Sequence, residues 1–184
     1  MIWIFGYVGV IWAVEVVNAI LGHRLDEFGI VPRATVGLRG LVLAPFLHSG
    51  FGHVMSNSAP IVILGGLVAT RGRNVLLGVS TSAAIFGGIG VWLFARPGVH
   101  IGASGVVFGY FGFLLARGWF ERSFVSILIS VLVLLFYGGL VLTAVPFATS
   151  VSWEGHLAGL ASGVACARYF RRRKRRPMVE SPQG

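Results

Sequence analysis

Charged residues are scarce in this sequence. They make up 11% of its 184 residues, whereas a soluble domain carries about 25%, which excludes an ordinary soluble protein. A single cysteine, Cys166, excludes an internal disulfide framework. The chain is instead 55% hydrophobic, with a mean hydropathy of +0.83 and 27 glycines, which allow transmembrane helices to pack closely. We therefore predict an all-α integral membrane protein.

Six apolar segments are candidates to cross a bilayer, which takes about 20 residues each. They cover residues 2–21, 51–70, 75–95, 102–117, 124–144 and 153–170. We predict a six-helix transmembrane domain over residues 1–170 and a basic cytoplasmic tail over 171–184. The fourth segment is short, since its 16 residues give about 24 Å against a hydrocarbon core of about 30 Å. Its helix is therefore expected to begin within the membrane.

The basic residues are unevenly placed, and their placement predicts an orientation. Seven of the 15 are Arg168 and the run 171–176, directly after the last apolar segment. Cytoplasmic ends of membrane proteins carry an excess of Lys and Arg, so we expect both termini to be cytoplasmic in a multi-pass protein of a bacterial plasma membrane. This placement indicates contact with anionic lipid headgroups and not binding of nucleic acid.

A serine and a histidine lie in glycine-rich apolar segments. Ser104 belongs to Gly102-Ala-Ser104-Gly105, and His156 opens a segment with Gly159 and Gly163 on its own helix face. Polar residues inside membrane segments are functional candidates, and serine beside imidazole is the minimum set for a nucleophilic hydrolase. The alternatives are a small packing serine and a histidine with satisfied hydrogen bonds. Close packing of the glycine faces would bring the two side chains together.

Three polar residues on three predicted helices share one depth. Ser104, His156 and Asn57 precede the next cytoplasmic basic residue by 12 to 14 positions, or about 18–21 Å of helix. His53 lies four residues before Asn57 and therefore on the same helix face. Near the serine, His53 and Asn57 could donate hydrogen bonds to an oxyanion. The alternative is interhelical hydrogen bonding that holds the helices together.

The remaining titratable residues argue against a metal site and against a catalytic triad. His48, His53 and His156 have no accompanying carboxylate or cysteine on a shared face, so we expect neither a metal nor another cofactor. Glu154 lies two residues before His156, on the opposite side of the helix. The sequence therefore predicts a Ser–His dyad without an orienting acid.

These motifs together resemble those of the rhomboid family of intramembrane serine proteases. The stretch Phe46-Leu-His48-Ser-Gly-Phe-Gly-His53-Val-Met-Ser-Asn57 is similar to the second-helix motif, residues 102–105 to the GxSG motif, and residues 156–163 to the sixth-helix motif. The resemblance implies a six-helix core, Ser104 as nucleophile and His156 as general base. It further implies His53, Asn57 and the Ser104 N–H as oxyanion donors, and a structural or solvating role for His48.

The chain departs from the family pattern at three places. Phe108 stands where a tyrosine commonly stacks on the catalytic histidine, and Ser56 is small where some members carry a bulky residue at the substrate gate. The Trp-Arg pair of the first outer loop is absent, although Arg33 and Arg39 lie in that loop.

We therefore expect an intramembrane serine endopeptidase whose partners are transmembrane protein substrates and membrane lipid. The alternative is a catalytically inactive rhomboid-like protein that binds membrane clients, a class that generally lacks the dyad. A small transporter or channel would need a polar path across the membrane, and the polar residues here gather at one level. The sequence makes no prediction of oligomeric state.

Overall fold

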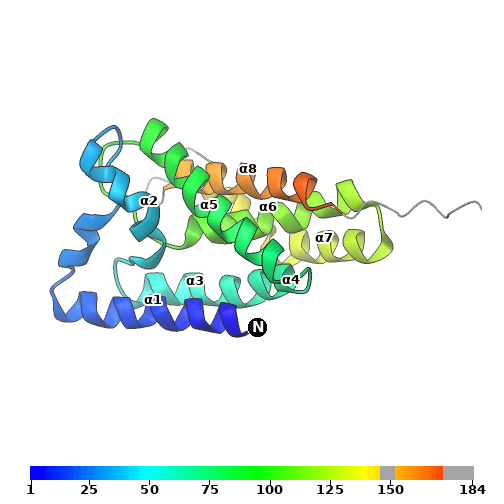
Figure 1. Ribbon diagram of the computed structural model, residues 1–184, viewed down its shortest axis with the longest axis horizontal. Coiled ribbons are helices and arrows are strands. Elements are labelled where there is room, and N and C mark those ends of the chain that lie inside the picture. The colour runs from blue at the N-terminus through cyan, green and yellow to red at the C-terminus, as the bar shows by residue number, and fades with distance from the viewer. Residues whose placement is uncertain (146–151, 172–184) are drawn as a thin grey trace, which may run out of the picture.

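The computed structural model describes residues 1–145 and 152–171. All regular elements in these ranges are helical, and the one strand-like contact among them is an isolated bridge between Ile30 and His100. The α-helices are α1 (Ile2–Ile20), α2 (Gly40–Leu43), α3 (Phe51–Pro60), α4 (Gly66–Ala69), α5 (Arg73–Phe94), α6 (Ser104–Glu121), α7 (Phe124–Tyr137) and α8 (Trp153–Tyr169) (Figure 1). The short 3-10 helices are η1 (Arg24–Phe28), η2 (Thr35–Arg39), η3 (Ala44–Phe46) and η5 (Gly138–Ala144), and η4 (Ile61–Gly65) is a π-helix. The all-α class is confirmed, whereas the predicted tail lies outside the described residues beyond Arg171.

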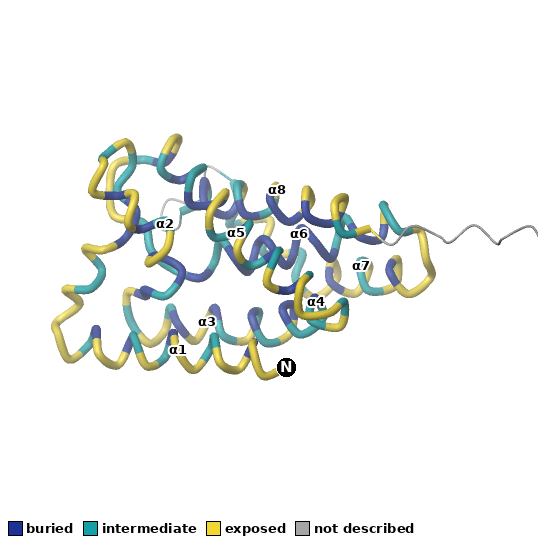
Figure 2. Tube along the Cα trace, in the orientation of Figure 1, coloured by how far each residue is buried: buried dark blue, intermediate teal, exposed yellow. Residues whose placement is uncertain are grey.

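The apolar surface identifies a multi-pass integral membrane protein. Four helical stretches are long and apolar enough to cross a membrane: Ile2–Ile20, Phe51–Ala69, Arg73–Phe94 and Phe124–Ala144. They carry many exposed large apolar side chains. Figure 2 shows long exposed stretches on α1 and α7 in yellow. Such faces are stable in contact with lipid chains and not with water. The exposed apolar residues are therefore the lipid-facing side of the bundle.

Helix α6 lies at the centre of the bundle. Most of its residues are buried, and the helix is largely dark blue in Figure 2. Phe108, Tyr110, Phe111 and Phe113 are among the largest fully buried side chains. It packs against α8, α5 and α7, so three neighbours fix its position. A residue at either end of α6 is consequently held by the core of the whole domain.

The bounds of α6 differ from the predicted segment 102–117. The helix begins at Ser104 and continues to Glu121, one turn beyond Arg117, before the chain turns at Arg122 with a φ of 50°. Arg117 is buried, and its Nε donates to Glu121 Oε2 at 2.9 Å. Because a carboxylate four residues later neutralises this arginine, its charge does not end the buried helix.

The predicted second helix changes its hydrogen-bond pattern in its middle. Residues Phe51–Ala69 are helical throughout, but the turns after Pro60 widen to a π-helix over Ile61–Gly65. Pro60 lacks a backbone N–H and crowds the carbonyl four residues before it, which breaks the regular hydrogen-bond ladder. The π segment packs against α1 and α6.

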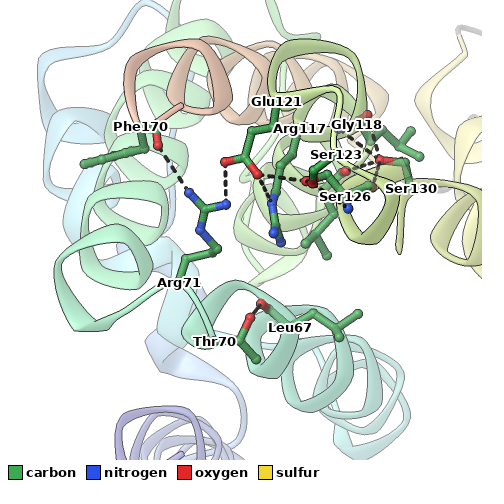
Figure 3. A network of polar contacts seen from close by, with 12 residues as sticks. Leu67, Thr70, Arg71, Arg117, Gly118, Glu121, Ser123, Ser126, Ser130 and Phe170 are labelled. Atoms are coloured by element: carbon green, nitrogen blue, oxygen red, sulfur yellow. Dashed lines mark hydrogen bonds and ion pairs between the residues drawn. The ribbon is translucent and has the colours of Figure 1, made fainter. Parts of the chain in front are cut away.

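A buried polar network joins the helices at the end of α6 away from Ser104 (Figure 3). Glu121 accepts hydrogen bonds from Arg117, from Ser126 Oγ at 2.8 Å on α7, and from Arg71 after α4. Arg71 also donates to the carbonyl oxygen of Phe170, directly after α8, at 3.5 Å. Removing one partner from such a buried group leaves uncompensated charge, which costs several kcal/mol. The network therefore ties α4, α6, α7 and α8 together.

Candidate active site

The chain turns sharply into α6 immediately before Ser104. Gly102 has a φ of +120°, and a Cβ at this position would lie 2.8 Å from the His53 ring, so both the backbone and the available space require glycine. The Gly102 N–H donates to the Ala44 carbonyl at 2.9 Å, and the Ala103 N–H donates to His48 Nε2 at 3.3 Å. These two bonds fix the loop that presents Ser104.

His48 acts on this loop as a neutral acceptor. Its side chain is fully buried in the segment between η3 and α3, and burial together with the nearby His53 lowers the pKa of His48 to about 4. A neutral imidazole keeps one nitrogen lone pair, whereas an imidazolium has none. His48 can therefore accept the Ala103 N–H throughout the physiological pH range.

Ser104 lies at a helix start with unused donors. It is half-buried, and among the described residues neither its hydroxyl nor the backbone N–H groups of Ser104 and Gly105 have a hydrogen-bond partner. The first N–H groups of a helix have no partner within the helix and lie at its positive end. This end of α6 can consequently stabilise negative charge that develops beside Ser104. A cavity of about 50 Å³ adjoins Ser104, and His100 and Ser152 also line it.

His156 is held over the first turn of α6. Its ring stacks on Phe108 with ring centres 4.3 Å apart and an interplanar angle of 11°. Its Nδ1 lies 2.9 Å from the Thr143 carbonyl oxygen. A carbonyl can only accept, so Nδ1 must carry the proton and Nε2 must keep its lone pair in the neutral ring. This is the tautomer that a general base requires.

Two glycine pairs bring α6 and α8 together. A Cβ on Gly159 would overlap the carbonyl oxygen of Gly105, and one on Gly163 would overlap the carbonyl oxygen of Gly109. The backbones of the two helices are thus in direct contact over two turns. Any side chain at these positions would move His156 away from the start of α6.

His53 and Asn57 lie on α3, beside the loop that precedes Ser104. The Ser49 N–H approaches His53 Nδ1 at 3.4 Å, which makes Nδ1 the acceptor and leaves the proton on Nε2, facing Gly102. Asn57 is buried and donates one of its two amide hydrogens to the His53 carbonyl at 2.9 Å. Among the described residues, each side chain therefore keeps one N–H without an acceptor, which can donate to another group.

The loop before Ser104 is also tied to the start of α8. Arg96 Nε donates to Glu154 Oε1 at 3.1 Å, and the Arg96 backbone N–H lies 3.3 Å from the same oxygen. His100 Nδ1 lies 2.9 Å from Ser152 Oγ. Ser152 and Glu154 lie four and two residues before His156. These contacts therefore connect the segments that carry Ser104 and His156.

Two of these features escaped the sequence analysis. The Thr143 group nearest to His156 Nδ1 is the backbone carbonyl oxygen at 2.9 Å, and the Thr143 hydroxyl lies 3.2 Å from the same nitrogen. Glu154 pairs with Arg96, and the sequence analysis did not predict this pairing. The available signal in the sequence was a carboxylate at the start of the sixth apolar segment, Glu154, together with a basic residue in the loop before Ser104, Arg96. In place of the missing Trp-Arg pair, Arg33 donates to the carbonyls of Leu93 and Ala95 at the end of α5.

Comparison with known proteins gives a consistent result. A family model described as the Rhomboid domain matches residues 36–173. An uncharacterized protein of Mycobacterium tuberculosis is 39% identical over 173 residues, which cover 89% of this chain and 72% of the relative. YdcA of Bacillus subtilis, named as a candidate rhomboid protease, is 29% identical over 133 residues, covering 67% of this chain and 62% of that protein. RHOMBOID-like protein 1 of Arabidopsis thaliana is 29% identical over 124 residues, or 64% of this chain and 31% of the relative.

Proposed function

The chain belongs to the rhomboid family, and on that basis we propose that it is an intramembrane serine endopeptidase. The observation that carries the proposal is the placement of His156. Its ring lies on Phe108, one turn after Ser104, and its Nδ1–H is fixed by the Thr143 carbonyl. Ser104 and His156 are then a catalytic dyad in which a backbone carbonyl takes the orienting role that an aspartate has in a triad.

The reaction proceeds in two halves. Ser104 Oγ attacks the scissile carbonyl carbon while His156 Nε2 takes the hydroxyl proton. The tetrahedral intermediate collapses, the C–N bond breaks, and His156 gives the proton to the leaving amine. Water then attacks the acyl-enzyme with the same base assistance and releases the second product and free Ser104.

The negative oxygen of the intermediate needs donors that are already in place. The candidates are the Ser104 backbone N–H, His53 Nε2–H and the second Asn57 amide hydrogen; the His53 ring adjoins Gly102, and Asn57 lies one turn after His53 on α3. In a low-dielectric site, losing one such donor costs about 100- to 1000-fold in kcat. The free N–H groups at the start of α6 support this assignment.

In the proposed topology the chain crosses the membrane six times, with α6 and α8 added to the four long apolar stretches. The start of α6 lies below the outer surface, where loop 96–101 is covered by protein contacts. Both termini are cytoplasmic in a bacterial plasma membrane, in keeping with the basic residues at the ends of α4, α6 and α8. The substrates are other transmembrane proteins, which enter from the lipid, and no cofactor is required.

Covalent labelling of Ser104 separates the protease from a client-binding protein without catalysis. A fluorophosphonate reacts with a serine only when a base activates its hydroxyl. We expect the purified parent protein to be labelled at Ser104, Ser104→Ala to be unlabelled, and His156→Ala to be labelled at least about 100-fold more slowly. A folded parent protein that takes no label would favour the client-binding function instead.

The pair of Arg96 and Glu154 is expected to position the dyad. Arg96→Gln removes a charge-assisted hydrogen bond from a buried carboxylate, a change of about 1.5–3 kcal/mol, and should lower kcat about 10-fold with little change in KM. Arg96→Lys, which keeps the charge, should restore most of the rate. Arg24→Gln is the matched control, because Arg24 is exposed and makes no hydrogen bond among the described residues. Equal losses for Arg96→Gln and Arg96→Lys would contradict the positioning role.

A further inference from the structure

A second cavity beside α6 is apolar and adjoins the small cavity at Ser104, with which it shares Pro45, Ala84 and Val106. We call it the α1–α5 groove; its volume is about 820 Å³, and side chains of α1, α2, η3, α5 and α6 line it. In Figure 1, α2 lies between α1 and α5 at the end of α1 away from the N-terminus. The floor is formed by buried Ile4, Leu76, Val106 and Tyr110, whereas Trp3 and Val10 form an exposed rim.

The groove offers water almost nothing to bind. Tyr7 Oη donates to the Pro45 carbonyl at 2.8 Å, and the hydroxyls of Ser80 and Tyr110 bond to each other at 2.7 Å. Three of the four hydroxyl groups in the lining are therefore satisfied within the protein, and the fourth belongs to Thr81. An apolar space with few polar partners does not hold ordered water. In a membrane, the remaining material that can fill it is a lipid chain.

The dimensions of the groove match a chain from one leaflet. From Ile2 to Val10 the α1 wall extends about 12 Å, and from Leu76 to Ile85 the α5 wall extends about 14 Å. One leaflet of hydrocarbon is about 15 Å deep, or half of the core. Pro45 and Phe46 of η3 line the groove and contact Tyr7 of α1. An acyl chain that enters from the N-terminal end of α1 therefore meets η3.

A cation and an aromatic ring mark the open end. The guanidinium of Arg73, the first residue of α5, lies 4.5 Å from the centre of the Trp3 ring, and Trp3 lines the groove. Tryptophan and arginine at the end of transmembrane helices lie at the level of lipid headgroups. The arginine is exposed and its charge is not paired with a carboxylate among the described residues. This end is complementary to a phosphate group.

We propose that the α1–α5 groove binds one anionic phospholipid, with an acyl chain along α1 and α5 and the headgroup phosphate at Arg73. In the proposed topology this lipid belongs to the cytoplasmic leaflet. Its chain packs against η3, whose Ala44 carbonyl holds Gly102 before Ser104. The bound lipid therefore supports the loop that presents Ser104. Binding itself does not depend on catalysis, so the test below stands apart from any cleavage assay.

The test is native mass spectrometry of the detergent-purified full chain with phosphatidylglycerol or phosphatidylcholine. The parent should retain one phosphatidylglycerol and about fivefold less phosphatidylcholine, as expected for one arginine at a lipid surface. Gly6→Phe should reduce retention about 10-fold, because Gly6 lines the groove and a Cβ there meets open space. Gly9→Phe is the matched control, since Gly9 is equally open on the same helix but does not line the groove.

Substitution of Arg73 provides a second, independent test. Arg73→Gln should lose the preference for phosphatidylglycerol, and Arg73→Lys should keep it; neither change alters the apolar walls. The proposal is overturned if the parent retains no lipid, if it retains both lipids equally, or if Gly6→Phe retains as much as Gly9→Phe. Should Gly6→Phe not fold, equal lipid preference in Arg73→Gln and Arg73→Lys would overturn it.

Discussion

Replacing Ser104 with alanine is expected to reduce cleavage of a model transmembrane substrate by about 10,000-fold or more. Without the hydroxyl, neither the tetrahedral intermediate nor the acyl-enzyme forms. The oxyanion donors then have no negative oxygen to stabilise. His156→Ala should lose a similar factor, because the hydroxyl then has no base. The two residues act as one unit, so the double variant should be no slower than either single variant. The measurement is the cleavage rate of the purified proteins in lipid bilayers.

The controls for this experiment lie in the same helices. Ser162→Ala removes a buried hydroxyl from α8 that has no hydrogen-bond partner in the described part of the chain, so it should leave cleavage unchanged. Thermal unfolding of each variant separates a loss of chemistry from a loss of fold. A double variant whose loss equals the product of the two single losses would show that Ser104 and His156 act independently. Parent-like cleavage by Ser104→Ala would eliminate the proposed mechanism altogether.

Local signals made much of this fold predictable. Helix bounds follow from apolar runs and from the breaks between them, and the structure starts or ends helices within a few residues of most predicted limits. The spacing of His156, Gly159 and Gly163 at i, i+3 and i+7 predicted a face for close approach, and the structure places Gly159 and Gly163 against α6. Both signals depend on residues near one another in sequence, which is why reading the sequence alone detects them.

Features that depend on distant partners were not predictable. The sequence predicts that Arg117 lies at the membrane boundary. In the structure it is paired with Glu121, which also accepts hydrogen bonds from Arg71 and Ser126, and this network keeps it inside the bundle. The carbonyl of Thr143 orients His156, and every residue has such a group, so the sequence cannot single it out. The groove between α1 and α5 likewise arises from how two apolar helices diverge, which their sequences do not reveal.

Among glycine-to-alanine substitutions in the core, Gly163→Ala is expected to lower stability and cleavage the most. The new Cβ would overlap the Gly109 carbonyl oxygen and lie 2.8 Å from the Phe113 backbone nitrogen, and neither backbone group can move aside. Overpacking of this kind costs about 1–3 kcal/mol, and here it also pushes α8 away from α6. Because His156 lies two turns before Gly163 on α8, cleavage should fall together with unfolding stability. Both are measured on the same purified protein.

Gly87→Ala provides the matched comparison, because Gly87 is a buried helical glycine that faces the same part of α8. A Cβ there would lie 3.6 Å from the Gly159 Cα, an ordinary van der Waals distance. Alanine is a better helix former than glycine by about 1 kcal/mol, so Gly87→Ala should be neutral or slightly stabilising and should retain cleavage. Opposite signs for the two substitutions would follow from contact geometry alone, since the chemical change is identical. If Gly163→Ala were as stable and active as Gly87→Ala, the close approach of α6 and α8 would not be what holds His156 over Phe108.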